Sequence, residues 1–346
     1  MNAVMVILFA LFLSGFKFSE QNQFFGGYCS IRQSNAIKGI FVILIFLSHG
    51  MDYFPLTQND IWVREMSEYL KQHIVVPFLF YSGFGVMESI QRKGYSYIRS
   101  IPFNRVLKTI IFADISVLTF ALFYLIIGRE FSVGKLLLSL VFWDKIGNNT
   151  WYFFVIVFLY LFTYISFRIF NKNYYLAAVL TAVLSMFLFF FLIRYKSIIW
   201  YNTFFCYHFG MWYSLLRSKI EPIVMRNDLI YFIALLIAFL AYLLFRSFGS
   251  FYYFIICGCW LMTLIVGLTM KIKVDNPFLQ FLGTHVLGFY SLHRIPMMIA
   301  SPWDMALVYK FVFCFLVTCI LVLIHESITK WIDRRLFCRF QRHTAV

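Results

Sequence analysis

Charged residues are scarce in this chain, and their scarcity indicates the class of protein. Only 13% of the 346 residues are Asp, Glu, Lys or Arg, whereas 62% are hydrophobic and the mean hydropathy is +0.80. A soluble domain of this length does not have such a composition. The composition therefore predicts a polytopic membrane protein and excludes an ordinary soluble enzyme.

Acidic residues are the scarcer of the two charged kinds. There are 15 Asp and Glu against 30 Lys and Arg, which gives a formal net charge of +15. A basic excess can indicate nucleic-acid binding, but here the cations lie in short loops between apolar runs. Membrane topology and anionic lipid headgroups explain such a distribution. We therefore expect membrane lipids, and no nucleic acid, as partners.

Patterned cysteines are missing as well. The seven cysteines are scattered, and only Cys257 and Cys259 lie close together, with no second Cys or His pair at ligand spacing. Neither a zinc site nor a disulfide framework is supported. The stretch HESIT at 325–329 is not the HExxH motif, because its fifth residue is Thr329. We expect no metal site.

Long apolar runs are what the chain does contain. A spanning helix needs about 20 mostly apolar residues. Segments near that length lie at 3–18, 36–54, 70–90, 105–128, 150–170, 174–193, 198–216, 228–245, 250–270, 277–300 and 305–328. The first lacks the basic start and small-residue cleavage site of a signal peptide, so we expect a retained helix. The predicted fold class is all-α, with about 10–11 transmembrane helices in one bundle.

The basic loops predict the orientation and the domain limits. Lys and Arg gather after the third predicted span, at 217–226 and in the last residues, and counting spans places these three loops on one side. The positive-inside rule makes that side cytoplasmic. We therefore expect a multi-pass protein of the cell (inner or plasma) membrane, with its N-terminus outside and its C-terminus in the cytoplasm. The expected parts are an extra N-terminal helix with a linker (1–30), one membrane domain (31–330) and a basic cytoplasmic tail (331–346).

Two ionisable residues in the second predicted span stand out. Lys38 begins the apolar run and His49 nearly ends it. Eleven positions turn an α-helix by about 1100°, so both lie on one face, about 16 Å apart along the axis. A lysine at a helix mouth is commonly an interface anchor, and a deep histidine can be a structural hydrogen-bond partner. Histidine also exchanges protons near neutral pH, and the pairing on one face favours a functional interpretation.

The spacing of Lys38 and His49 resembles the Arg/Lys-x10-His motif of the membrane acyltransferase-3 family, in which arginine is commoner at the first position. Further segments are similar to that family's motifs in the same order. They are VVPFLFYSGFGVMESI (75–90), YIRSIPFNRVLK (97–108), NNTWYFFVIVFLY (148–160) and NPFLQFLGTHVLGFYSLHRIPM (276–297).

The resemblance implies an integral-membrane enzyme that O-acylates surface sugars. Its donor would be a cytoplasmic acyl-CoA, commonly acetyl-CoA, and its acceptor a sugar hydroxyl of a surface or exported polysaccharide or of its lipid-linked precursor. Lys38 and His49 are then the expected catalytic residues. The donor phosphates call for cations at the cytoplasmic mouth, and the expected donor-binding residues are Lys38, Arg99 and Arg105. The expected substrate-binding residues are Ser82, Trp151, Tyr290 and His293.

The sequence leaves several alternatives open. His49 can act as the general base or carry the acyl group itself. The oxyanion partner can be Trp151, Tyr290 or His293, since Lys38 is too far from His49. A polysaccharide polymerase or flippase would also be polytopic, basic and aromatic-rich, but would be expected to have larger outer loops. A transporter would be expected to consist of two related halves with interrupted helices, and none stand out.

Overall fold

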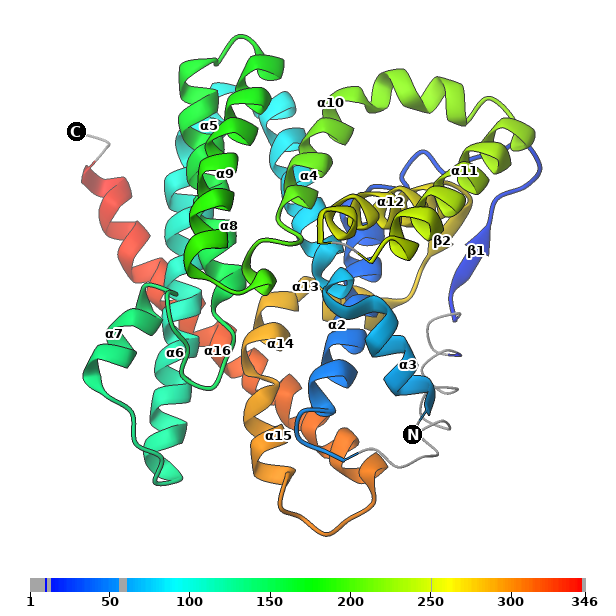
Figure 1. The fold of residues 1–346 in the computed structure, drawn as a ribbon. Coiled ribbons are helices and arrows are strands. Elements are labelled where there is room, and N and C mark those ends of the chain that lie inside the picture. The colour runs from blue at the N-terminus through cyan, green and yellow to red at the C-terminus, as the bar shows by residue number, and fades with distance from the viewer. Residues whose placement is uncertain (1–9, 11–13, 56–60, 250, 344–346) are drawn as a thin grey trace.

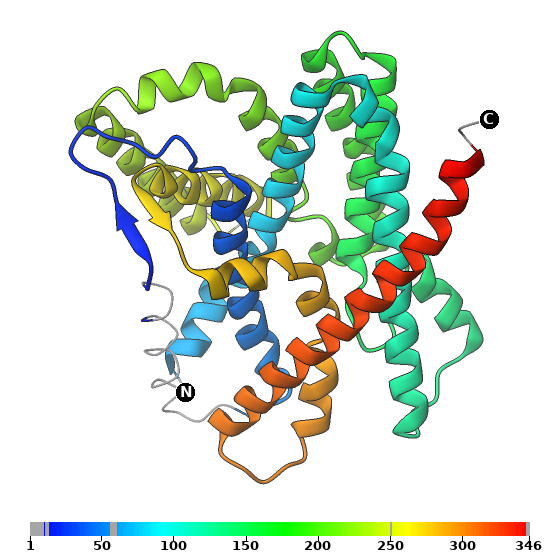
Figure 2. The same cartoon turned by 180° about the vertical axis from the view of Figure 1, so that it is seen from behind.

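The chain folds almost entirely into helices, as a computed structural model shows for residues 10, 14–55, 61–249 and 251–343 (Figures 1 and 2). The prediction of an all-α polytopic membrane protein is confirmed. The helices are α2 (Ile31–Gly50), α3 (Ile61–Leu70), α4 (Val76–Lys93), α5 (Tyr95–Ile101), α6 (Lys108–Ile126), α7 (Val133–Leu140), α8 (Trp151–Ile169), α9 (Tyr174–Tyr195), α10 (Phe205–Val224), α11 (Asp228–Ser247), α12 (Phe251–Lys271), α13 (Pro277–Thr284), α14 (Val286–Leu292), α15 (Arg294–Ala300) and α16 (Leu307–His343). Short 3-10 turns cover Lys71–Val75 and Ile198–Trp200, and a π-helical turn at Pro102–Leu107 joins α5 to α6.

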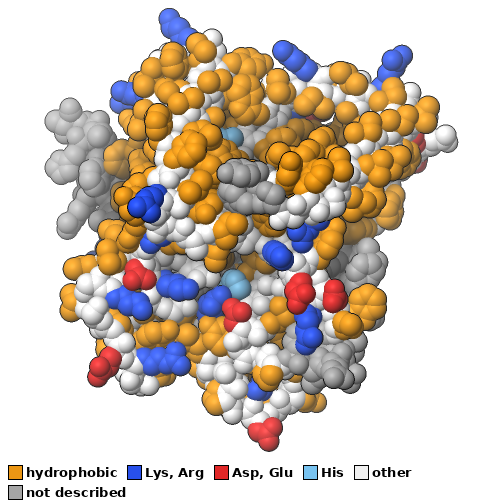
Figure 3. All heavy atoms as spheres, in the orientation of Figure 1, with side chains coloured by type: hydrophobic (Ala, Val, Ile, Leu, Met, Phe, Trp, Pro, Cys, Tyr) orange, Lys and Arg blue, Asp and Glu red, His pale blue; other side chains and the backbone are white. Residues whose placement is uncertain are grey.

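Eight helices in the described part of the chain are long and apolar enough to cross a membrane. They cover Ile31–Gly50, Arg64–Lys93, Tyr95–Ile126, Trp151–Ile169, Tyr174–Tyr195, Asp228–Ser247, Tyr253–Lys271 and Leu307–Arg335. Large apolar side chains on their outer faces are exposed, such as Phe187 (70%), Leu236 (56%) and Leu316 (57%). Figure 3 shows the resulting hydrophobic surface over the upper part of the molecule. Water would disfavour so much apolar surface, whereas lipid accommodates it.

Three of the predicted spans differ in the structure. Segment 277–300 is not one helix but α13, α14 and α15 in succession. Pro296 lacks the N–H that would bond to the Leu292 carbonyl, so the helix breaks after Leu292. Segment 198–216 begins with a 3-10 turn, and α10 starts only at Phe205. Segment 3–18 falls largely outside the described residues, and its last three residues form strand β1 (Phe16–Phe18) instead of helix.

A small antiparallel sheet ties the beginning of the described chain to the late helices. Strand β1 pairs with β2 (Ile272–Val274), and Phe16 lies opposite Val274. Asp275 forms ion pairs with Lys17 at 3.1 Å and with Arg32, in the first turn of α2, at 3.2 Å. These contacts place the N-terminal end of α2 next to the start of α13.

Glycines allow two pairs of helices to pack with their backbones almost in contact. A Cβ added to Gly39 in α2 would lie 2.0 Å from the Leu279 carbonyl oxygen in α13, and one added to Gly283 in α13 would lie 1.8 Å from the Asn35 oxygen in α2. Helices α4 and α10 have the same reciprocal arrangement: Gly83 faces the Tyr207 oxygen and Gly210 faces the Phe80 oxygen. Small residues serve this purpose in membrane helix pairs. Helix α16 runs obliquely across the back of the bundle (Figure 2).

Gly83→Ala is expected to destabilise the protein, because the new methyl group would lie 1.9 Å from the Tyr207 oxygen. Overpacking of this kind typically costs about 1–3 kcal/mol. A thermal unfolding scan in detergent measures the loss. Gly85→Ala on the same helix is the matched control, because a Cβ there meets nothing within 4 Å. Equal loss in the two variants would contradict the close-packing argument.

Candidate active site

A large cavity opens beside the N-terminal half of α2. Its volume is about 700 Å³, and Lys38, Ser82 and Arg105 line it together, although they come from three separate segments. The other lining residues include Ser34, Tyr81, Glu88, Arg92, Tyr152, Ile156, Tyr160, Arg217 and Val286. The sequence motifs that carry Lys38, Ser82 and Arg105 thus meet around one space.

The cations of this cavity are only partly compensated. Arg217 pairs with Glu88 at 3.2 Å, but no carboxylate of the described residues forms an ion pair with Lys38 or Arg105. Arg105 instead donates a hydrogen bond from Nε to the Tyr97 hydroxyl at 3.0 Å, and Lys38 lies near enough to Arg105 for the two charges to repel. Arg105 projects from the π-helical turn, a backbone feature common at functional sites. Unpaired cations in a cavity favour an anionic ligand.

The opposite end of α2 carries the second half of the site. The His49 Nδ1 atom lies 2.6 Å from Nε2 of His293, which stands between α14 and α15. The two ring planes are inclined by only 7° and the centroids are 4.8 Å apart, so the rings meet edge to edge through these nitrogen atoms. The residue between α14 and α15 is thus a second histidine in contact with His49.

Hydrogen bonding fixes the protons of this histidine pair. The His293 Nδ1 atom lies 2.7 Å from the Phe289 carbonyl oxygen, and a carbonyl can only accept, so Nδ1 carries the proton. Neutral His293 must then accept at Nε2, which requires His49 to donate from Nδ1. The His49 Nε2 atom is left as the acceptor of its ring. His293 thus holds His49 in the tautomer that can take a proton at Nε2, and it would stabilise the imidazolium that forms.

A small cavity of about 10 Å³ lies beside His293, the hydrogen-bond partner of His49. Val42, Ile45, Phe46, Val286, Phe289, Tyr290 and His293 line it. Lys38, Val42, Ile45 and His49 follow one another at helical spacing on one face of α2. Val286 lines both the large and the small cavity. Lys38 lines the large cavity and Val42 and Ile45 line the small one, so both spaces lie along this face of α2.

The remaining predicted site residues occupy different places. Tyr290 lines the small cavity, and its hydroxyl donates to the Asn149 carbonyl oxygen at 3.1 Å. Trp151 is only 5% exposed and packs edge-on against Tyr152. Arg99 is exposed and does not line the large cavity. The roles predicted for these residues stay predictions.

Arg294 is a residue near the site that the sequence reasoning missed. It follows His293 directly and lies close enough to interact electrostatically with both histidines. Its guanidinium bonds to Asp52 at 3.1 Å and to the Tyr53 hydroxyl at 3.5 Å. A cation inside an apolar segment is the signal that could have identified it.

These motifs and their arrangement agree with the comparison to known families. The chain belongs to the acyltransferase-3 family, whose model, an acyltransferase domain, matches residues 31–326. The match runs from the first residue of α2 into α16 and includes Lys38, His49, Arg105 and His293. Comparison with curated proteins and with solved structures gave no significant match. The protein is thus a multi-pass membrane acyltransferase.

His293→Ala is expected to lower kcat for acyl transfer at least tenfold, because His49 would lose the acceptor that fixes its tautomer. The donor KM should change little, since His293 does not line the large cavity. His293→Gln should recover part of kcat, because its amide oxygen can accept from His49 Nδ1. Steady-state kinetics over a range of pH measure both effects. A kcat that survives in His293→Ala would refute the positioning role.

Proposed function

We propose that the protein is an O-acyltransferase that moves an acyl group from a cytoplasmic acyl-CoA to a sugar hydroxyl. The acceptor is a surface or exported polysaccharide or its lipid-linked precursor, and the membrane is the cell membrane. The observation that carries the proposal is the joint arrangement on α2. A cavity with uncompensated cations lies at one end of the helix face, and a histidine pair with a free acceptor atom lies at the other.

The large cavity has the chemistry that an acyl-CoA donor requires. A CoA carries several phosphates, and Lys38 and Arg105 provide positive charge that no described carboxylate neutralises. Its volume of about 700 Å³ is in the range of cavities that hold cofactor-sized ligands. Lys and Arg gather in the last turn of α4 (Arg92 and Lys93), and in and just after the C-terminal half of α10 (Arg217, Lys219 and Arg226). This distribution supports a cytoplasmic position for this end of α2. The C-terminus then lies in the cytoplasm.

The histidine pair supplies the proton transfer. A sugar hydroxyl gives its proton to His49 Nε2 while its oxygen bonds to the thioester carbonyl carbon, which places negative charge on the carbonyl oxygen. Collapse of that intermediate breaks the carbon–sulfur bond, and the imidazolium returns the proton to the departing thiolate. In the second route, His49 Nε2 attacks the thioester carbonyl carbon, the carbon–sulfur bond breaks and the thiolate leaves. The sugar hydroxyl then attacks the acyl-histidine, the carbon–nitrogen bond breaks to restore His49, and the hydroxyl proton passes to the released thiolate. Both routes begin at the same nitrogen atom.

The cluster around Arg294 supports an acceptor approach from the opposite side of the membrane. Arg294, Asp52 and Tyr53 lie near the end of α2 that carries His49. Together they offer hydrogen-bond donors and hydrogen-bond acceptors. Sugar hydroxyls both donate and accept, so such a mixed cluster suits them. Arg294 also brings positive charge near the histidine pair, where the oxyanion develops.

His49→Ala is expected to lower acyl transfer by about 10²–10⁴-fold, the usual contribution of a general base. Cells that lack the gene are complemented with the wild type or with His49→Ala. Mass spectrometry of their surface glycans then measures the acyl ester on the sugar. His208→Gln is a control for the loss of a buried histidine, because His208 lines neither cavity. If the surface glycans of cells with His49→Ala were esterified as fully as those of the wild type, the proposal would be wrong.

Lys38→Ala is expected to raise the donor KM about tenfold or more and to leave the acceptor KM nearly unchanged, since one charged contact to a phosphate is lost. Lys38→Arg should retain donor binding, because arginine is the residue commoner in the family motif. Lys93→Ala is the matched control, as Lys93 is exposed on the same side but does not line the cavity. Titration of acyl-CoA in membranes measures the constants. An unchanged donor KM in Lys38→Ala would make Lys38 a lipid anchor only.

A further inference from the structure

The small cavity beside the histidine pair is large enough for one small group only. Its volume is about 10 Å³, and a cavity of that size holds about one water-sized group. The acyl carbon must come within bonding distance of the acceptor oxygen beside His49. The tail of the acyl group therefore has to fit next to His49 and His293.

We propose that this cavity is the acyl pocket and that Ile45, Val286 and Tyr290 restrict the transferred group to acetyl. This inference rests on the proposed function, because it concerns the acyl group that the same site transfers. An acetyl group brings a single methyl into the pocket. Each further methylene would have to displace the walls.

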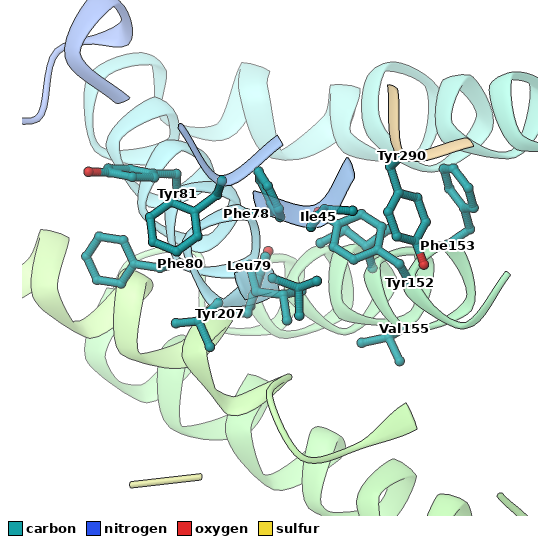
Figure 4. Close-up of a cluster of buried hydrophobic side chains, with 14 of the residues drawn as sticks. Ile45, Phe78, Leu79, Phe80, Tyr81, Tyr152, Phe153, Val155, Tyr207 and Tyr290 are labelled. Carbon is teal, nitrogen blue, oxygen red and sulfur yellow. The ribbon is translucent and has the colours of Figure 1, made fainter. Parts of the chain in front are cut away.

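The walls of the pocket are fixed by their own packing. Ile45 is 4% exposed and Tyr290 is 7% exposed. The Tyr290 ring packs against Tyr152 and Phe153, with centroids 5.5 and 6.0 Å away, and its hydroxyl is held by Asn149. Figure 4 shows Tyr290 beside Tyr152 and Phe153, with Ile45 between these rings and Phe78. Packed interiors of this kind do not yield to an added methylene without strain.

The lining also selects for the chemistry of the acyl tail. The lining side chains are apolar except for the His293 ring and the Tyr290 hydroxyl. The His293 ring is hydrogen-bonded to His49 and to the Phe289 carbonyl, and the Tyr290 hydroxyl is hydrogen-bonded to Asn149. A succinyl or other charged acyl group would bury a carboxylate there without a partner, which is strongly unfavourable. The pocket therefore rejects longer tails by size and charged tails by desolvation.

Ile45 is the residue best suited to a test. It lies one helical turn before His49 and lines the pocket with an apolar side chain. Ile43 on the same helix is 3% exposed, is equally apolar and does not line the pocket. The two isoleucines share residue type, helix and burial and differ in the face that they occupy, so Ile43→Ala is the matched control for Ile45→Ala.

The experiment measures kcat/KM with acetyl-CoA, propionyl-CoA and butyryl-CoA in membranes that contain the full chain. One added methylene changes the selectivity of an apolar pocket by roughly 10–200-fold, so the wild type should prefer acetyl-CoA over propionyl-CoA by that factor. Ile45→Ala should raise the propionyl-to-acetyl ratio about tenfold or more, and Ile43→Ala should leave it unchanged. Ile45→Val, which removes a single methyl group, should give an intermediate ratio even if the alanine variant does not fold.

The outcomes separate this inference from the proposed function. A wild type that transfers acetyl and butyryl groups equally well would overturn the pocket and leave the acyltransferase proposal standing. The same holds if Ile43→Ala widens the selectivity as much as Ile45→Ala, or if neither Ile45 variant widens it. A wild type that transfers no acyl group from any of the three donors would overturn both.

Discussion

The close approach of α2 to α13 is the constraint on which the site depends. Gly39 lies against the Leu279 carbonyl and Gly283 lies against the Asn35 carbonyl, so any side chain at either glycine would force the helices apart. This contact fixes the register between the helix that carries His49 and the segment that continues to His293. A hydrogen bond of 2.6 Å between two rings from segments this far apart in sequence tolerates little error in that register.

The sequence predicted the features that follow from local periodicity. The shared face of Lys38 and His49 depends only on helical geometry, and both cavities lie along that face. The all-α class follows from hydropathy alone. The pairing of His49 with His293 could not be predicted this way, because 244 positions separate the two residues and periodicity says nothing about contacts between distant segments.

The predicted span at 277–300 shows why element boundaries are harder to predict. Its hydropathy is that of one membrane helix, and hydropathy does not record the missing N–H of Pro296 or the interruption at His285 between α13 and α14. The break matters for chemistry, since it places His293 between two short helices, where its ring meets His49. A sequence motif likewise does not show which of its residues reaches the cavity. Arg99 and Arg105 match one motif, but only Arg105, from the π-helical turn, lines the large cavity.

The unequal sizes of the two cavities have a physical rationale in group transfer. In the proposed reaction the donor would be recognised mainly through the carrier that is released, and the large, cation-lined space suits that carrier. The transferred group has little surface and must be selected by fit, so it needs the small one. Val286 lines both spaces, so the thioester of the proposed donor would lie at their junction. Binding free energy from the carrier can then hold the reacting carbonyl beside His49, where the acyl group itself makes few contacts.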